Sequence, residues 1–204
     1  MSKKEKILDA ALKLFNTQGT DVITVRHIAA ELEMSHGNLC YHYPTKDDII
    51  YALYEKLVSE LDSKIEEYDH KEITFKESFE SSDYAIKVFY KYRFLMLDIV
   101  SIMRSIPKIK THYRALMKKR NLQFKALFEK SVASGFMRKE NFSGEYNTLI
   151  DLLSVIGDFW IAHGEIQFEG TDEQKISHYS KILFSAFSPY LTPIGWMEFM
   201  GVNK

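Results

Sequence analysis

The chain has 204 residues, 46% of them hydrophobic, and a formal net charge of −1. This apolar content argues for a sizeable core and against a disordered chain, whereas the near-zero total charge gives no argument for nucleic-acid binding. The single cysteine, Cys40, excludes an intramolecular disulfide and is typical of a reducing compartment. The sequence shows no signal-peptide pattern and no apolar run long enough to span a membrane. We therefore expect a cytoplasmic protein with no membrane contact.

The first part of the chain predicts a helix followed by two shorter ones. Apolar residues from Ile7 to Phe15 recur at three- and four-residue steps, which predicts a helix that ends near Gly19. Thr24 stands before the next periodic segment, where an N-cap residue is expected. Small residues are needed where the two short helices touch, and Ala29 and Ala30 supply them.

The third helix is predicted over 36–42, with Ser35 as its N-cap. Pro44 ends this helix, because the residue before a proline is pushed away from helical geometry. Thr45 then caps a long fourth helix, and its N-terminus together with Lys46 would bind a phosphate.

The rest of the chain is also predicted to be helical, and it shows no alternation typical of strands. From about residue 70 the apolar pattern continues, with a break at Pro107 and a stop at Gly135. Two further helices are expected over 144–168 and 173–190, followed by a loosely ordered tail from Thr192. We expect an all-α fold of about nine helices.

The second and third helices have the features of a helix-turn-helix. Such a motif holds two helices at a fixed angle so that the second enters the major groove of DNA. Met34 and Leu39 would fill the space between the helices. The second helix would present polar and aromatic side chains to base edges and phosphates, and Gly37 would let the backbone approach DNA closely.

Over Lys6 to Ile50 the sequence resembles the TetR family of bacterial transcription regulators. The matching segments are I-L-D-A-A-L-K-L-F, Gly19, T-V-R-H-I-A-A-E-L, M-S-H-G-N-L-C-Y-H-Y and P-T-K-D-D-I. The resemblance implies a three-helix DNA-binding domain over residues 1–46. It further implies a larger helical domain over 47–204 that binds a ligand and dimerises.

The resemblance also implies roles for individual residues. Thr24 and Arg26 would contact backbone phosphates, the third helix would face the groove, and Lys46 would anchor a phosphate. The expected DNA-binding residues are Thr24, Arg26, Ser35, His36, Gly37, Asn38, Tyr41, His42 and Lys46. The chain departs from the family pattern at His27, at Glu33 in the turn where Gly is common, at Asn38 and at Cys40. These departures leave the preferred DNA sequence open.

Two later helices carry broad apolar faces, which could pair with their copies across a two-fold axis. The expected dimer-interface residues are Leu152, Ile156, Phe159, Leu183 and Phe187. Ordinary intrachain core is the alternative explanation for the same residues.

Aromatic residues and methionines are dense on the helices that, by the resemblance, surround an effector cavity. The candidate pocket residues are Tyr84, Phe89, Tyr92, Met103, Phe124, Phe128, Trp160 and His163. Such a lining suits an apolar or aromatic ligand. A plain helical core is the alternative explanation for the same residues.

The leading hypothesis is a sequence-specific DNA-binding regulator, a homodimeric repressor of a palindromic double-stranded operator that a small apolar or aromatic effector releases. The alternative is a regulator controlled by a protein partner with no small-molecule ligand. Its basis is residues 104–139, which carry eleven Lys or Arg against one Glu. Enzyme readings find no support, because the sequence contains no nucleotide-binding glycine pattern and no metal-ligand spacing. We expect no catalytic residue, cofactor or metal site.

Overall fold

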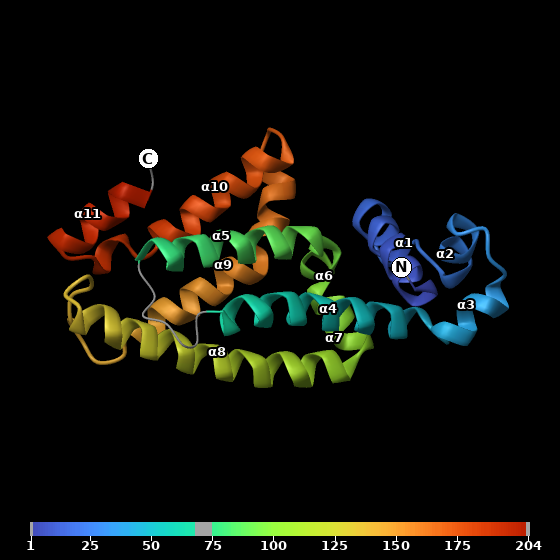
Figure 1. The fold of residues 1–204 in the computed structure, drawn as a ribbon, viewed down its shortest axis with the longest axis horizontal. Coiled ribbons are helices and arrows are strands. Elements are labelled where there is room, and N and C mark those ends of the chain that lie inside the picture. The colour runs from blue at the N-terminus through green and yellow to red at the C-terminus, as the bar shows by residue number, and fades with distance from the viewer. Residues whose placement is uncertain (1, 68–74, 203–204) are drawn as a thin grey trace. The chain divides into compact units, whose positions relative to one another are not determined.

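The computed structural model describes residues 2–67 and 75–202, and their regular structure is helical (Figure 1). The helices are α1 (Lys3–Gln18), α2 (Val25–Glu31), α3 (His36–His42), α4 (Lys46–Glu66), α5 (Phe75–Lys91), α6 (Arg93–Leu97), α7 (Ile99–Ser105), α8 (Pro107–Ala133), α9 (Glu145–Gln167), α10 (Asp172–Ser185), the 3₁₀ turn η1 (Ser188–Tyr190) and α11 (Pro193–Val202). Within the described residues the only β pairing is an isolated bridge between Met137 and Leu191. The predicted all-α fold class is confirmed.

The number of helices is close to the prediction, and the two additional ones have identifiable causes. The helical segment predicted before the break at Pro107 is interrupted at Asp98, which closes α6 and opens α7. The start of the helix expected near residue 70 lies outside the described residues. In the described part of the chain, no helix combines the length and apolar character required to cross a membrane.

The tail is the clear departure from the sequence prediction, because the residues after Thr192 form α11 rather than a loose end. Pro193 occupies the first helical position, where its missing N–H does no harm. The Thr192 hydroxyl oxygen accepts a hydrogen bond from the Gly195 N–H at 3.1 Å. Phe199 is buried and stacks on Phe184 with ring centroids 5.2 Å apart. Aromatic burial late in the tail therefore stabilises a helix that the prolines alone did not predict.

The chain forms two compact units, one made of residues up to 63 together with 88–112, and the other of 64–87 together with 113–204. In the first unit, α1 packs against α6 through the Phe15 and Phe94 rings, whose centroids are 5.1 Å apart. The Asn16 side chain donates to the Lys91 carbonyl oxygen at 2.8 Å and accepts from the Phe94 N–H at 3.1 Å. These contacts attach the N-terminal helices to the segment 88–112. The predicted boundary at residue 46 remains a prediction.

The second unit has its own hydrophobic core between α8, α9, α10 and α11. The buried members are Phe128, Met137, Leu149, Ile150, Leu153, Phe184, Leu191 and Phe199. The loop between α8 and α9 is closed by an ion pair, in which Arg138 donates to both carboxylate oxygens of Glu145 at 2.6 and 2.8 Å. The same carboxylate accepts from the Asn141 N–H at 2.7 Å. This bidentate arrangement fixes the start of α9.

Candidate nucleic-acid interface

The helix-turn-helix consists of α2 and α3, and both helices begin at the predicted caps. The Thr24 hydroxyl oxygen accepts from the His27 N–H at 3.4 Å, and His27 Nδ1 accepts from the Thr24 N–H at 3.3 Å. A histidine thus completes the reciprocal box that Glu or Gln usually completes. The Ser35 hydroxyl oxygen accepts from the Asn38 N–H at 3.2 Å. These caps fix where the helix expected in the groove begins.

The turn between the helices requires a left-handed residue, and Glu33 supplies it with φ of +50°. The Met34 N–H donates to the Ala29 carbonyl oxygen at 3.0 Å, which closes the turn. Ala29 is buried at the helix contact, whereas Ala30 is exposed, so the expectation that both alanines serve the contact is wrong for Ala30. Consecutive residues lie about 100° apart around a helix, so Ala30 points away from the side of α2 on which Ala29 is buried. Leu39, which is fully buried, fills the space as predicted.

The residues predicted to bind DNA are all exposed or half-exposed. Tyr41 on α3 is 85% exposed, and its ring meets the His42 ring edge-on with centroids 5.3 Å apart. A Cβ added at Gly37 would meet no atom within 4 Å, so nothing within the described chain requires a glycine there. The surface of α3 is therefore polar, aromatic and open to a partner.

The N-terminus of α4 is more engaged with the protein than the sequence predicted. The Lys46 ammonium donates to the Thr20 carbonyl oxygen at 2.6 Å. Thr45 and Asp48 form a reciprocal cap, because the Thr45 hydroxyl oxygen accepts from the Asp48 N–H and the Asp48 carboxylate accepts from the Thr45 N–H, both at 3.1 Å. A lysine ammonium has three N–H donors, and this hydrogen bond uses one of those of Lys46.

The residues predicted for the dimer interface separate into two groups. Leu152 and Phe159 on α9 are each 48% exposed, and Ile156 between them is half-buried. Leu183 and Phe187 are half-buried and pack against the core of the second unit. Exposed Val155 and Ile166 extend the first group, so α9 carries an apolar strip that the described residues leave uncovered.

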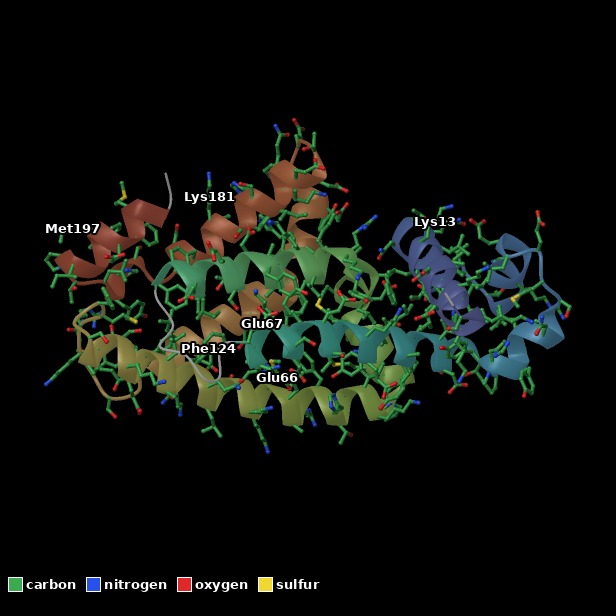
Figure 2. All side chains as sticks on the ribbon, viewed as in Figure 1. Lys13, Glu66, Glu67, Phe124, Lys181 and Met197 are labelled. Carbon is green, nitrogen blue, oxygen red and sulfur yellow. The ribbon has the colours of Figure 1, made fainter. Side chains whose placement is uncertain are left out.

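The candidate pocket residues are divided between the two units. Phe89, Tyr92 and Met103 lie in the first, and the other five lie in the second. Tyr92, Phe128 and Trp160 are buried, and Phe124 on α8 (Figure 2) is half-buried against the core. The Tyr92 hydroxyl donates to Glu60 at 2.6 Å. His163 is exposed and hydrogen-bonded to Tyr179. Their assignment to a pocket stays a prediction.

One polar pair in the second unit was not predicted from the sequence. Tyr113 on α8 donates its hydroxyl hydrogen to the carboxylate of Asp158 on α9. The signal in the sequence was an acidic residue inside the apolar run from Leu149 to Trp160.

Comparison with protein families gives the class of the protein. The model described as "Bacterial regulatory proteins, tetR family" matches residues 7–53, and the model TetR, "Bacterial transcriptional repressor", matches residues 56–199. With the helix-turn-helix at its N-terminus, the protein is a DNA-binding transcriptional regulator. Because the second match spans more than half of the sequence, the chain belongs to the TetR family. Members of this family are generally not enzymes.

Two curated relatives are similar over part of their length. The HTH-type transcriptional regulator HbdR of Aromatoleum sp. (strain CIB) is 27% identical over 144 residues, which is 68% of this chain and 62% of HbdR. An HTH-type transcriptional regulator in the dhlA 5' region of Xanthobacter autotrophicus is 34% identical over 55 residues, 27% of each protein. The chain therefore matches less than two thirds of either relative.

Solved structures share the fold. A TetR-family regulator from Marinobacter aquaeolei VT8 superposes with a TM-score of 0.89 at 24% identity, covering 100% of this chain and 98% of that one. A transcriptional regulator from Saccharomonospora viridis in complex with choline gives 0.70 at 19% identity, covering 91% and 95%.

Proposed function

We propose that the protein is a homodimeric repressor that reads a palindromic operator with α3 and leaves DNA when a small effector binds. The observation that carries this proposal is the α3 surface. It is capped at Ser35, backed by fully buried Leu39, and exposes polar and aromatic residues with Gly37 among them. A short helix held in this way is suited to the major groove.

Roles within the interface follow from chemistry. Thr24 and Arg26 at the start of α2, and Lys46 at the start of α4, contact phosphates and position the protein. On α3, Asn38 reads a base edge, since an amide can pair with adenine through two hydrogen bonds. Tyr41, which is 85% exposed, lies at the phosphates or in the groove beside them.

Dimerisation is supported by the exposed apolar strip of α9, formed by Leu152, Val155, Phe159 and Ile166. Exposed apolar side chains in a row along one helix are typical of an interface. Two copies joined through this strip would present two α3 helices to two half-sites.

Effector release is supported by relatives of the same fold. Neighbours in this fold include a SmeT–triclosan complex and the choline complex, with TM-scores of 0.63 and 0.70. In this chain, the segment 88–112 of the first unit holds α1 through Asn16. A ligand that favours one conformation of this segment would shift the population of DNA-competent dimers.

The test is a titration of the protein onto the DNA upstream of its own gene at several salt concentrations. We expect nanomolar-range specific binding whose logarithm falls linearly with the logarithm of salt, because counterions return to the phosphates. A protein without DNA affinity even at low salt would reject the proposal. Light scattering on the same sample should give the mass of a dimer.

A second candidate is control by a protein partner through the basic residues of α8. Lys118, Lys119 and Lys125 are exposed on this helix. The variant Lys118→Glu/Lys119→Glu distinguishes control by an effector from control by a protein partner. If an effector controls the repressor, the variant binds DNA and responds to ligand as the wild type does. Loss of regulation in cells with intact DNA affinity in vitro would favour the partner.

A further inference from the structure

The inner face of α9 is interrupted by a glycine that the packing does not require. Ile150, Leu153, Gly157, Trp160 and Gly164 follow one another at three- and four-residue steps, and all except Gly157 are buried. Among the described residues, a Cβ added at Gly157 would meet no atom within 4 Å. Close-packed interiors leave few such gaps. Gly157 itself is half-buried, so solvent reaches this position.

Gly164, two steps further along the same face, is a glycine that the packing does require. A Cβ there would lie 3.0 Å from the Tyr179 ring and 3.2 Å from the Lys175 side chain, so α10 needs the close approach. Gly157 has no such neighbour. A glycine inside a long helix weakens it relative to alanine, and here no contact within the described residues compensates.

An acidic group stands beside this space. Asp158 is half-buried, and the Tyr113 hydroxyl from α8 donates to its carboxylate. Among the described residues, no lysine, arginine or histidine forms an ion pair with it. Burial raises the pKa of the Asp158 carboxyl, while the hydrogen bond from Tyr113 opposes that rise. A carboxylate has acceptor sites for more than one donor, and burial of part of its surface without a counter-charge costs free energy.

From this geometry we infer that Gly157, Asp158 and Tyr113 form the polar end of the effector site, and that the effector is an organic ammonium ion. The inference rests on the proposed effector-responsive function and adds a charge to the apolar or aromatic ligand. The ammonium pairs with the Asp158 carboxylate and lies near the Tyr113 ring, which attracts cations through its face. The space at Gly157 admits the apolar body of the ligand.

Three probes with one carbon skeleton test the charge: 4-phenylbutylamine, 4-phenylbutan-1-ol and 4-phenylbutyrate. Calorimetric titration of the full chain at pH 7.5, without DNA, should show the amine binding about ten- to hundredfold more tightly than the alcohol, as expected for a charge-assisted pair. The carboxylate should bind most weakly. An amine that binds no more tightly than the alcohol, or does not bind, overturns the inference.

Asp158→Asn keeps the shape of the side chain and removes its charge. It should abolish the preference for the amine and lower amine affinity to that of the alcohol. Asp151→Asn, an exposed acid on the same helix, is the matched control and should leave the preference unchanged. A preference that survives Asp158→Asn overturns the inference.

Gly157→Leu tests whether the ligand occupies the space beside Gly157. It should weaken binding of the amine and the alcohol at least tenfold by occupying the gap, whereas Gly157→Ala should retain binding. Unchanged amine binding in Gly157→Leu would overturn this placement, and a misfolded variant would leave Asp158→Asn as the deciding test. Operator binding by wild type measures the proposed function separately, so a repressor that binds DNA but shows no amine preference refutes only the inference.

Discussion

At the scale of residues, the turn of the helix-turn-helix carries a conformation that its residue does not favour. Glu33 has φ of +50°, in the region that costs a non-glycine residue about 1–2 kcal/mol. The Glu33 N–H still donates to the Ala30 carbonyl oxygen at 3.1 Å, so the turn closes despite the side chain. The hydrogen bonds and the buried Leu39 behind them therefore determine the turn.

Glu33→Gly should stabilise the protein by up to about 1 kcal/mol, because relief of the left-handed conformation exceeds the added freedom of the unfolded chain. Urea unfolding, monitored by circular dichroism, measures this change in the free energy of unfolding. Glu33→Ala keeps the Cβ and is the control, for which no such gain is expected. Equal gains in both variants would show that the glutamate side chain, and not the backbone, causes the strain.

Asn38→Ala and Lys46→Ala should change DNA binding in different ways. Loss of a base contact at Asn38 should cost about 1–3 kcal/mol on the preferred operator and change the preferred base at that position. Loss of Lys46 should weaken binding to all sequences alike and reduce the salt slope by about one. Selection from a random DNA pool with each variant gives both readouts. Identical behaviour of the two variants would contradict the assignment of α3 to the groove.

At the scale of elements, the loop from α8 to α9 is held by one charged pair. Glu145 is 7% exposed and accepts from Arg138 and from the Asn141 N–H. The hydrogen bonds from the Arg138 side chain, with that from Asn141, lower the pKa of the Glu145 carboxyl to about 2. A depressed folded-state pKa means that this stabilisation is present above the unfolded pKa and is lost as pH falls through the folded value.

Glu145→Gln should therefore lower the stability most at pH 7, and the gap between wild type and variant should narrow between about pH 4.5 and pH 2. Thermal unfolding at a series of pH values measures this difference in stability. Glu129→Gln, at an exposed acid on α8, should show no such pH-dependent difference from the wild type. A gap that does not depend on pH would mean that the lost packing, and not the charge, is responsible.

The exposed strip on α9 makes a second prediction at this scale. Phe159→Lys should convert the proposed dimer to a monomer, because it places a charge within the proposed apolar interface. Operator affinity should then fall by about 100-fold or more, since the second half-site no longer binds as part of one molecule. Light scattering measures the molecular mass, and fluorescence anisotropy measures the operator affinity. Leu122→Lys, at an exposed apolar position on α8, should change neither.

At the scale of the whole molecule, the functional unit is the proposed dimer on its operator. Two recognition helices in a two-fold arrangement read half-sites separated by about one helical turn, or a multiple of it, so the protected DNA should be palindromic. Footprinting with hydroxyl radicals should give symmetrical protection about one centre. A single unsymmetrical protected site would contradict the two-fold arrangement.

Much of the N-terminal region could be predicted because its signals are local. Thr24, Ser35 and Pro44 act on helix ends within three or four residues, and the observed bounds of α3 are those predicted. The exposure of Ala30 could not be predicted from composition, since it depends on which side of α2 meets α3. Likewise, α11 depends on Phe199 reaching Phe184, a contact between residues of different helices.

The sequence alone determined the helix-turn-helix, its caps and the family, because capping, proline geometry and helical periodicity act between near neighbours. Only the tertiary structure decided which apolar residues are covered and which are not. It buried Phe128, left Phe159 exposed, left Gly157 without a close neighbour among the described residues, and placed the Tyr113 hydroxyl on the Asp158 carboxylate. Burial and long-range hydrogen bonds depend on which helix faces meet, and a periodic pattern on one helix does not specify its partner.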